Sequence, residues 1–382
     1  MVRTALAGVL AGVVLVLGGL ARAGEGAPAA GGKVALGRDL RAFPEGDYEV
    51  VQSFESRTQQ QAKDQPPQST SLRNTLTFDM KFKPPGEKLE DEGHVTVAVA
   101  RVQVEMEVGD TLFYDSAARP DLKVEPRREL KAVPREGGET AGQSKKDSEL
   151  TMQSGQVMAR QFSYLVGRSS RAVVRLSVVP NRPQIEKFEG LDVAWDEFVR
   201  ESHANPKDAG GKLDETSLVM LKRTYGDSML TRMLAQGVEF LPPAPPRDPN
   251  APLGTVRKAT VAVGDTWKVT RRLLGARFQP TDVEHTCKLI AVKDGDAVVS
   301  VAWKFDHKAQ EDAKEGKSLG VAAIDETGSM ELTFHATSAM LTGLKSTVIR
   351  AEKAESTDET GKPIETTSKA VETRSFVIRP KI

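Results

Sequence analysis

Cysteine is nearly absent from this chain of 382 residues, in which Cys287 stands alone. With one thiol no intramolecular disulfide can form, so the fold must rest on apolar burial and on hydrogen bonds between strands. Aromatic residues make up only 5% of the chain. This scarcity disfavours a sugar-processing cleft with aromatic walls, and we interpret Trp195, Trp267 and Trp303 as anchors of an apolar core.

An excess of charge of one sign is also missing, because 53 basic residues balance 53 acidic ones. Nucleic acids and anionic membrane surfaces are bound by concentrated basic faces, so neither is an expected partner.

Motifs that carry chemistry are scarce. The five histidines form no His-x-x-x-His pair, and no glycine-rich loop stands between a strand and a helix as a phosphate site requires. The best metal candidate joins His285 and Cys287 on one strand face, with His307 on the neighbouring strand; the alternative is a pair of half-buried strand residues. We therefore expect no catalytic residues, no metal site and no cofactor, and a protein that is not an enzyme.

One long apolar run is present, and it lies at the start of the chain. Residues 5–20 carry no charge, Arg3 precedes them, and Ala21-Arg22-Ala23 follows with the small-x-small pattern of a cleavage site. We expect residues 1–23 to be a signal peptide, 24–36 to be a disordered leader, and the mature protein to be periplasmic or secreted without a membrane span.

Apolar and polar residues alternate through much of the remaining chain, which is the period of a half-buried β-strand. A change of phase at Ala100–Arg101 predicts a bulge in one such strand, and Asp294-Gly295 predicts a type I′ hairpin. We expect a polar loop from Gln59 to Gln68. Two Asp-Glu-Thr-Gly segments, at 325–328 and 358–361, are interpreted as turns and not as calcium loops.

Helical spacing of apolar residues appears in residues 150–165 and in three stretches between 195 and 237. Asp214 and Asp227 are predicted to cap the last two of these helices, and Gly226 and Gly237 to end them. Residues 120–146 are rich in charge and are expected to form a long exposed excursion.

These patterns predict a mainly β protein with inserted helices (α+β), built from two curved antiparallel sheets or half-barrels with a helical segment between them. Unit one spans 37–241 and holds the helical insert, 242–260 form a Pro-rich linker, and 261–382 form unit two. A weak internal repeat is expected, because Gly46–Val50 and Gly264–Val269 both open a strand after a Gly-Asp turn.

Several segments carry a resemblance to a known group of proteins. They are the aromatic strand opener Tyr48, Phe113–Ser116, the run Phe162–Val179, Phe240–Pro242 and Val261–Trp267. On these residues the chain resembles a family of uncharacterised exported bacterial proteins classed as a domain of unknown function, and distantly the open half-barrels of lipoprotein carriers. The resemblance covers most of the mature chain and implies a curved, β-rich fold, but it brings no catalytic residues.

Three functions remain open. An open curved sheet must cover its apolar face with helices or with a ligand. If the helices act as a lid, the protein binds an apolar ligand, a lipid or lipoprotein; if they fill the groove, it is a structural or protein-interaction module of the cell envelope. A hydrolase with an unrecognised site is the third reading. The predicted ligand groove consists of Trp195, Phe198, Leu218, Leu221, Leu230, Met233 and Leu234.

Overall fold

The structure is a computed structural model. It describes residues 33–62, 66–88, 90–108, 110–117, 123–125, 161–175, 184–204, 215–246, 248–250, 255–274, 280–308, 320–357 and 363–381. The predicted signal peptide, the cap Asp214, the turn at 358–361 and nearly all of the charged excursion lie outside these residues.

Strands make up most of the described chain, as the alternating pattern predicts. Those of the first half are β1 (Lys33–Leu36), β2 (Gly46–Ala62), β3 (Gln68–Lys83), β4 (Glu92–Val108), β5 (Asp110–Asp115), β6 (Lys123–Glu125) and β7 (Ser169–Arg175). Those of the second half are β8 (Ala259–Ala262), β9 (Thr266–Leu274), β10 (Pro280–Lys293), β11 (Asp296–Lys308), β12 (Gly320–His335), β13 (Leu341–Thr357) and β14 (Pro363–Pro380).

The helices whose two ends are described are few, and all except η1, which lies between β1 and β2, lie between the two runs of strands. They are α3 (Leu191–Ala204), α4 (Glu215–Tyr225) and α5 (Asp227–Ala235), with the short 3-10 helices η1 (Leu40–Ala42) and η2 (Val238–Phe240). Residues 161–165 are also helical, and they are the described end of the helix predicted over 150–165.

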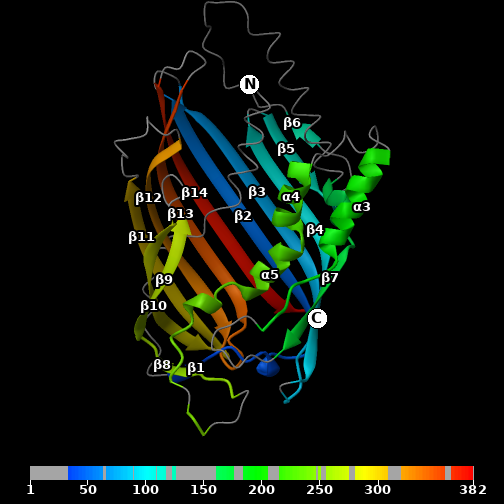
Figure 1. Cartoon of the computed structure of the whole chain (residues 1–382), viewed down its shortest axis with the longest axis vertical. Coiled ribbons are helices and arrows are strands. Elements are labelled where there is room, and N and C mark those ends of the chain that lie inside the picture. The colour runs from blue at the N-terminus through cyan, green and yellow to red at the C-terminus, as the bar shows by residue number, and fades with distance from the viewer. Residues whose placement is uncertain are drawn as a thin grey trace, which may run out of the picture.

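The strands form one large antiparallel sheet, not the two sheets that the sequence predicts. Its order is β6-β5-β4-β3-β2-β14-β13-β12-β11-β10-β9, and β7 pairs with the end of β4 that β5 leaves open. Most strands adjacent in the chain are adjacent in the sheet, but β7 pairs with β4, and β1 and β8 pair with each other in a separate sheet. In addition, β2 pairs with β14 over fifteen residue pairs, from Tyr48↔Pro380 to Ala62↔Thr366. This pairing of the first long strand with the last joins the two halves, as Figure 1 shows.

The interior is also continuous. A single cluster of buried apolar side chains takes residues from both halves of the sheet and from the helices. The predicted boundary at 242–260 stays a prediction, and the internal repeat is not confirmed, since β2 has 17 residues whereas β9 has 9. The predicted leader also ends earlier than expected, because Lys33–Leu36 pair with β8 in a separate two-stranded sheet.

Two local predictions are confirmed. The register between β3 and β4 shifts where Thr77 pairs with Arg101 and Phe78 with Val99, so Ala100 is the extra residue of a bulge. Asp294 and Gly295 have φ angles of 53° and 84°, the pair of positive values that a type I′ turn needs between β10 and β11.

Part of one predicted loop and the whole of one predicted turn are strand instead. Gln59–Gln68 was expected to be a loop, yet β2 runs to Ala62 and β3 begins at Gln68, because these polar residues continue a ladder with β14 and with each other. The segment 325–328, expected to be a turn, lies in the middle of β12, where it pairs with β11 and β13 on both sides.

The helices lie over one face of the sheet, which we call the inner face. Figure 1 shows α4 and α5 crossing in front of the central strands, with α3 beside them. Every second residue of the strands points to this face, and these residues are the buried ones, such as Phe78, Met80 and Phe82 in β3. The opposite, outer face carries mainly the polar members of the alternation, with a few exposed apolar side chains such as Ile349, Val371 and Val377.

A buried carboxylate, that of Asp227, ties the helices to each other and to the sheet. Its oxygens accept hydrogen bonds from the backbone N–H groups of Gly190 (3.1 Å), Leu191 (3.0 Å) and Asp192 (3.1 Å), and from the hydroxyl of Ser170 on β7. In return, Asp192 Oδ1 accepts from the N–H of Asp227 at 3.0 Å. Two helix N-termini therefore cap each other through their aspartates.

This arrangement corrects the predicted role of Asp227. The N-cap of α5 is Gly226, and Asp227 is the first helical residue, whose side chain serves α3 instead of its own helix. A Cβ at position 226 would lie 2.2 Å from Asp192 Oδ1 and 2.3 Å from the carbonyl oxygen of Lys222. Glycine is thus required here by the close approach of α3 and α4 to α5.

We predict that Asp227→Asn lowers the free energy of unfolding by about 1–3 kcal/mol, because an amide nitrogen then faces N–H donors that stay buried. Urea denaturation measures the change. Asp196→Asn is the matched control, since the Asp196 side chain is half exposed and pairs with Lys222 at 2.6 Å. Its expected cost is below about 1 kcal/mol, and equal losses in the two variants would contradict the role of Asp227.

Candidate functional site

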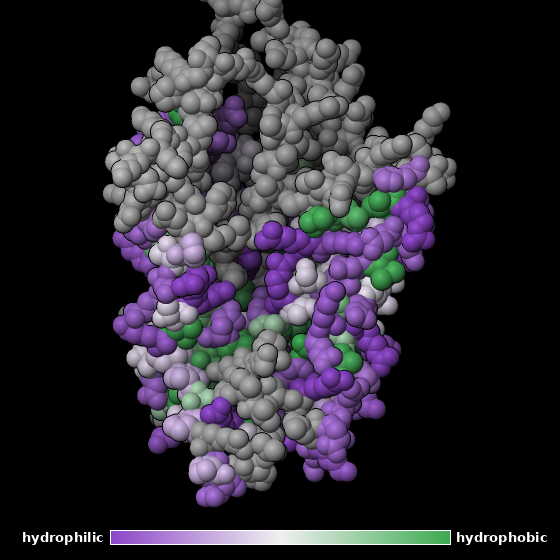
Figure 2. Space-filling view, viewed as in Figure 1, coloured by the Kyte–Doolittle hydropathy of each residue, from purple (hydrophilic) through white to green (hydrophobic). Residues whose placement is uncertain are grey.

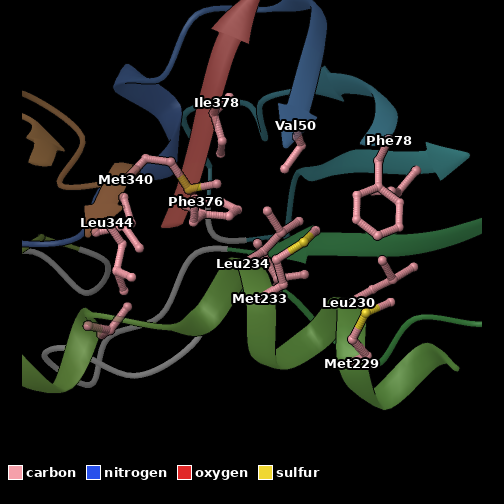
Figure 3. Close-up of a cluster of buried hydrophobic side chains, with 14 of the residues drawn as sticks. Val50, Phe78, Met229, Leu230, Met233, Leu234, Met340, Leu344, Phe376 and Ile378 are labelled. Atoms are coloured by element: carbon pink, nitrogen blue, oxygen red, sulfur yellow. The ribbon is translucent and has the colours of Figure 1, made fainter. Parts of the chain in front are cut away.

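The apolar half of the inner face lies beneath α5. Figure 3 shows Met229, Leu230, Met233 and Leu234 of α5 facing Val50, Phe78, Phe376 and Ile378 of the central strands, with Met340 and Leu344 beside them. All ten side chains are buried. We call this the apolar layer.

The residues of the predicted groove belong to the same interior. Trp195, Leu230, Leu234 and Met233 are at most 2% exposed, Phe198 is 6% and Leu221 is 9% exposed, and Leu218 is partly buried against the cluster. They pack as the apolar faces of α3, α4 and α5. The structure thus brings them together against the sheet, and their role as a ligand groove stays a prediction.

Further along the strands the inner face changes from apolar to charged. One cross-strand row reads Gln52, Phe376, Leu344, Leu332, Val299. Another row, six residues or about 20 Å farther on, reads Thr58, Ala370, Arg350, Glu326, Phe305. The inner face is therefore amphipathic along its length.

Five charged side chains form a cluster at this second level, which we call the charged cluster: Glu326, Arg350, Glu352, Glu372 and Arg374. Arg350 Nη1 lies 3.6 Å from Glu326 Oε2, and Arg350 also pairs with Glu352. Arg374 Nη2 lies 3.6 Å from Glu372 Oε2. Burial raises the pKa of both Glu326 and Glu372, against the opposing effect of the arginines.

Two aromatic rings enclose the charged cluster. The indole Nε1 of Trp303 donates to Glu326 Oε1 at 3.0 Å, and the Arg374 guanidinium lies 5.1 Å from the centre of the Phe54 ring. Trp303 lies over Gly328, where an added Cβ would come within 2.1 Å of the indole. Gly328, which was predicted to lie in a turn, therefore leaves room for the Trp303 ring because it has no side chain.

Sequence reasoning missed this cluster, although a signal was present. Ile324, Glu326, Gly328, Met330 and Leu332 share one face of β12, and the period of two continues through all of them. A glutamate and a glycine at two of these positions made the segment look like a turn. The alternation in this segment indicates a strand only if the charged Glu326 is accepted as one of the buried, inward-facing residues.

The two residues of the candidate metal pair, His285 and Cys287, lie in the core. His285 is 1% exposed, its Nδ1 lies 3.1 Å from the carbonyl oxygen of Val283, and its ring lies 4.9 Å from that of Trp303. Burial lowers the pKa of His285 to about 4 and raises the pKa of the Cys287 thiol to about 12. Both groups are thus neutral core residues at pH 7.

His307 does not complete this pair. Its ring stacks on that of Phe305 at 5.9 Å, four residues along β11 from Trp303, the neighbour of His285. Across the described part of the chain, no three His, Cys, Asp or Glu side chains gather as a metal site needs.

The sequence contains one catalytic spacing. Residues 316–320 are Gly-Lys-Ser-Leu-Gly, the spacing of a nucleophile elbow. That motif needs a strand before the serine and a helix after it, whereas Gly320 begins strand β12. Ser318 itself lies outside the described residues.

Two hollows lie on the outer face, away from the apolar layer. The first, of about 410 Å³, is lined mainly by polar residues of β2 to β4, among them Ser53, Glu55 and Thr75, with Phe113 beside them. The second, of about 590 Å³, is lined by residues such as Gln59, Lys353 and Lys369. Their linings suit water better than an apolar ligand.

The outer surface of the helices is largely hydrophilic. In Figure 2 hydrophobic patches lie over α3 and α4, and the exposed Val193 and Val219, each 58% exposed, belong to these helices. None of the described helices combines the length and the apolar character needed to span a membrane.

Comparison with known proteins gives distant likenesses only. No family model and no curated protein matches the sequence. A structure of lipovitellin and its lipid–protein interactions is similar at TM-score 0.30 and 8% identity, covering 89% of this chain but 26% of that one, so the chain spans about a quarter of lipovitellin's length. Pseudomonas aeruginosa OccK7 (OpdD) is similar at TM-score 0.21 and 6% identity, covering 88% of this chain and 100% of that one.

A third structure, Pseudomonas aeruginosa OpdQ, is similar at TM-score 0.17 and 5% identity, with 87% of this chain and 98% of that one covered. At these TM-scores the likenesses carry no argument about the arrangement of the sheet or about function. The structure itself defines a mainly β protein with one large antiparallel sheet and few helices.

We predict that the lowered pKa of His285 makes stability depend on pH. The unfolded chain takes up this proton below the ordinary pKa of 6.5, the folded chain only below about 4. The free energy of unfolding therefore falls as the pH drops through this window, by up to about 3 kcal/mol. His285→Phe, which keeps an aromatic ring between Trp303 and Phe240, should flatten the dependence in urea titrations, and an unchanged dependence would contradict this role of His285.

Proposed function

We propose that this is an exported, non-enzymatic protein that binds an apolar ligand, a lipid or the lipid part of a lipoprotein, and carries it in the periplasm. The ligand would lie in the apolar layer, between α5 and the central strands. The export part of the proposal rests on the signal-like residues 1–23, and the binding part rests on the way the inner face is covered.

One observation carries the binding proposal: short helices cover the apolar half of a very wide sheet. A second sheet packed there would be a permanent cover, whereas short helices are not. Helix α5 has nine residues, and its N-cap residue Gly226 has no side chain of its own, so the cap at this end comes from Asp192 of α3. A helix this short is unstable in isolation, so it holds its place through its contacts. Such a helix can yield its apolar contacts to a ligand of similar character.

The character of the cover agrees with this. Two of the four apolar residues of α5 that face the sheet, Met229 and Met233, are methionines. Their unbranched side chains adapt to partners of different shape more readily than leucine or valine does. The charged cluster ends the apolar layer on one side, which suits a ligand with an apolar body of limited length.

The second candidate is a structural or protein-interaction module of the cell envelope. The near-complete burial of Trp195, Leu230 and Leu234 favours it, because an interior this well filled needs no ligand. The two functions differ in what the protein carries when it is isolated from cells.

We predict that the mature protein, purified from the periplasm under mild conditions, carries bound lipid. Native mass spectrometry should show a mass excess that disappears on denaturation, and organic extraction should recover it as lipid. A bare mass with no extractable lipid would count against the carrier and in favour of the interaction module.

Two variants locate the ligand once the wild-type mass has been measured. Leu230→Gln places a polar group in the apolar layer and should lower the lipid content several-fold. Val219→Gln, on the exposed face of α4, is the matched control and should leave it unchanged. The comparison is made on variants with a wild-type circular dichroism spectrum, and equal lipid content in both would contradict binding beneath α5.

A further inference from the structure

Arg38 is a buried charged residue whose side chain has fewer hydrogen-bond partners than its burial requires. It lies between β1 and η1 and is 3% exposed. Its carbonyl oxygen accepts from Gln184 Nε2 at 2.9 Å, and the next residue, Asp39, donates its N–H to the carbonyl oxygen of Ser338 at 2.9 Å. The backbone at this position is thus held from two sides, and the side chain enters the interior from a fixed point.

The guanidinium makes few hydrogen bonds for its burial. Nη2 donates to the carbonyl oxygen of Leu234, in the last turn of α5, at 3.0 Å. Nε and Nη1 are buried and have no hydrogen-bond partner among the described residues. A cation is favoured at a helix C-terminus, yet a guanidinium has five N–H donors and most of them are unused here.

One carboxylate acts on Arg38, and it is shared with a second arginine. The carboxylate that acts on it is that of Glu239, and Glu239 is also 3.4 Å from Arg271 Nη2. Gln236, which follows α5, has a second buried and unpartnered donor, Nε2. Burial lowers the pKa of Arg38 to about 10, so the group still carries its charge at pH 7.

A buried cation with unused donors destabilises a fold unless an anion or another acceptor satisfies it. Buried arginines with free donors are suited to carboxylates and phosphates, which their planar geometry matches. Arg38 also lies at the end of the apolar layer, since its partner Leu234 is one of the side chains that face the sheet there (Figure 3).

We propose that Arg38 binds the anionic head of an amphiphilic ligand, a carboxylate or a phosphate monoester on a single apolar chain. The unpartnered donors of its guanidinium hold the head, while the chain lies along the apolar layer. This inference rests on the proposed function and adds the class of ligand to it.

Three probes with the same chain test it: palmitate, hexadecyl phosphate and hexadecanol. Isothermal titration calorimetry on the delipidated mature protein should show palmitate or hexadecyl phosphate binding at least about tenfold more tightly than hexadecanol. Whichever of the two binds more tightly identifies the head as carboxylate or phosphate.

Variants then assign the preference to Arg38. Arg38→Met removes the charge and keeps an apolar side chain, and it should bind the three probes with equal affinity. Arg38→Lys keeps the charge and should retain a reduced preference, which serves if the methionine variant fails to fold. Arg41→Met is the control, since Arg41 pairs with Asp39 at 2.8 Å near the surface and should not affect the preference.

The outcomes separate the two proposals. Equal binding of all three probes by the wild type, or a preference that survives in both Arg38 variants, overturns the inference and leaves the binding of apolar ligands standing. Failure of all three probes to bind overturns both, because it removes the apolar ligand itself.

Discussion

The carboxylate of Asp227 is the interaction on which the helical layer depends. A single sheet buries only one of its faces, and that face needs a cover. Here the cover consists of short helices, none of which would be stable alone. Asp227 joins the N-termini of α3 and α5 and bonds to Ser170 of β7, so the helices are fixed to one another and to the sheet at the same point. The position of every apolar side chain beneath α5 follows from this anchor.

The inner face beneath the helices changes from apolar to charged along the strands. This change limits the length of an apolar group that can lie on it. Leu344 and Leu332 occupy one level of the sheet, whereas Arg350 and Glu326 occupy another level on the same strands. Charges inside a fold contribute little net stability even when paired, because each has lost its hydration. Their pairing on adjacent strands instead marks where the apolar layer stops. An apolar group in the layer meets a boundary at this level of the sheet.

The sequence predicts local features of this fold well and long-range ones poorly. The period of two reveals most strands, and the phase change at Ala100 and the Asp294-Gly295 pair reveal a bulge and a hairpin, since each depends on neighbouring residues only. The joining of two predicted sheets through β2 and β14 has no local signal, because the pairing partners are about 300 residues apart. The apolar faces of α3 to α5 were predictable, but Glu326 and Arg38 were not, because charged residues are expected at the surface.

The buried polar groups of the inner face and its cover differ in how many of their hydrogen-bonding atoms have partners. This difference distinguishes groups with a structural role from a candidate for ligand binding. The oxygens of Asp227 accept from three N–H groups and a hydroxyl, as expected of a group with a purely structural role. The charged cluster pairs cations with carboxylates, so its charges largely offset each other. Of these three, Arg38 combines near-complete burial with donors that have no acceptor among the residues that the structure describes. A fold that satisfies Asp227 so fully had the means to satisfy Arg38, and leaving it open is most simply explained by a partner that arrives from outside the chain.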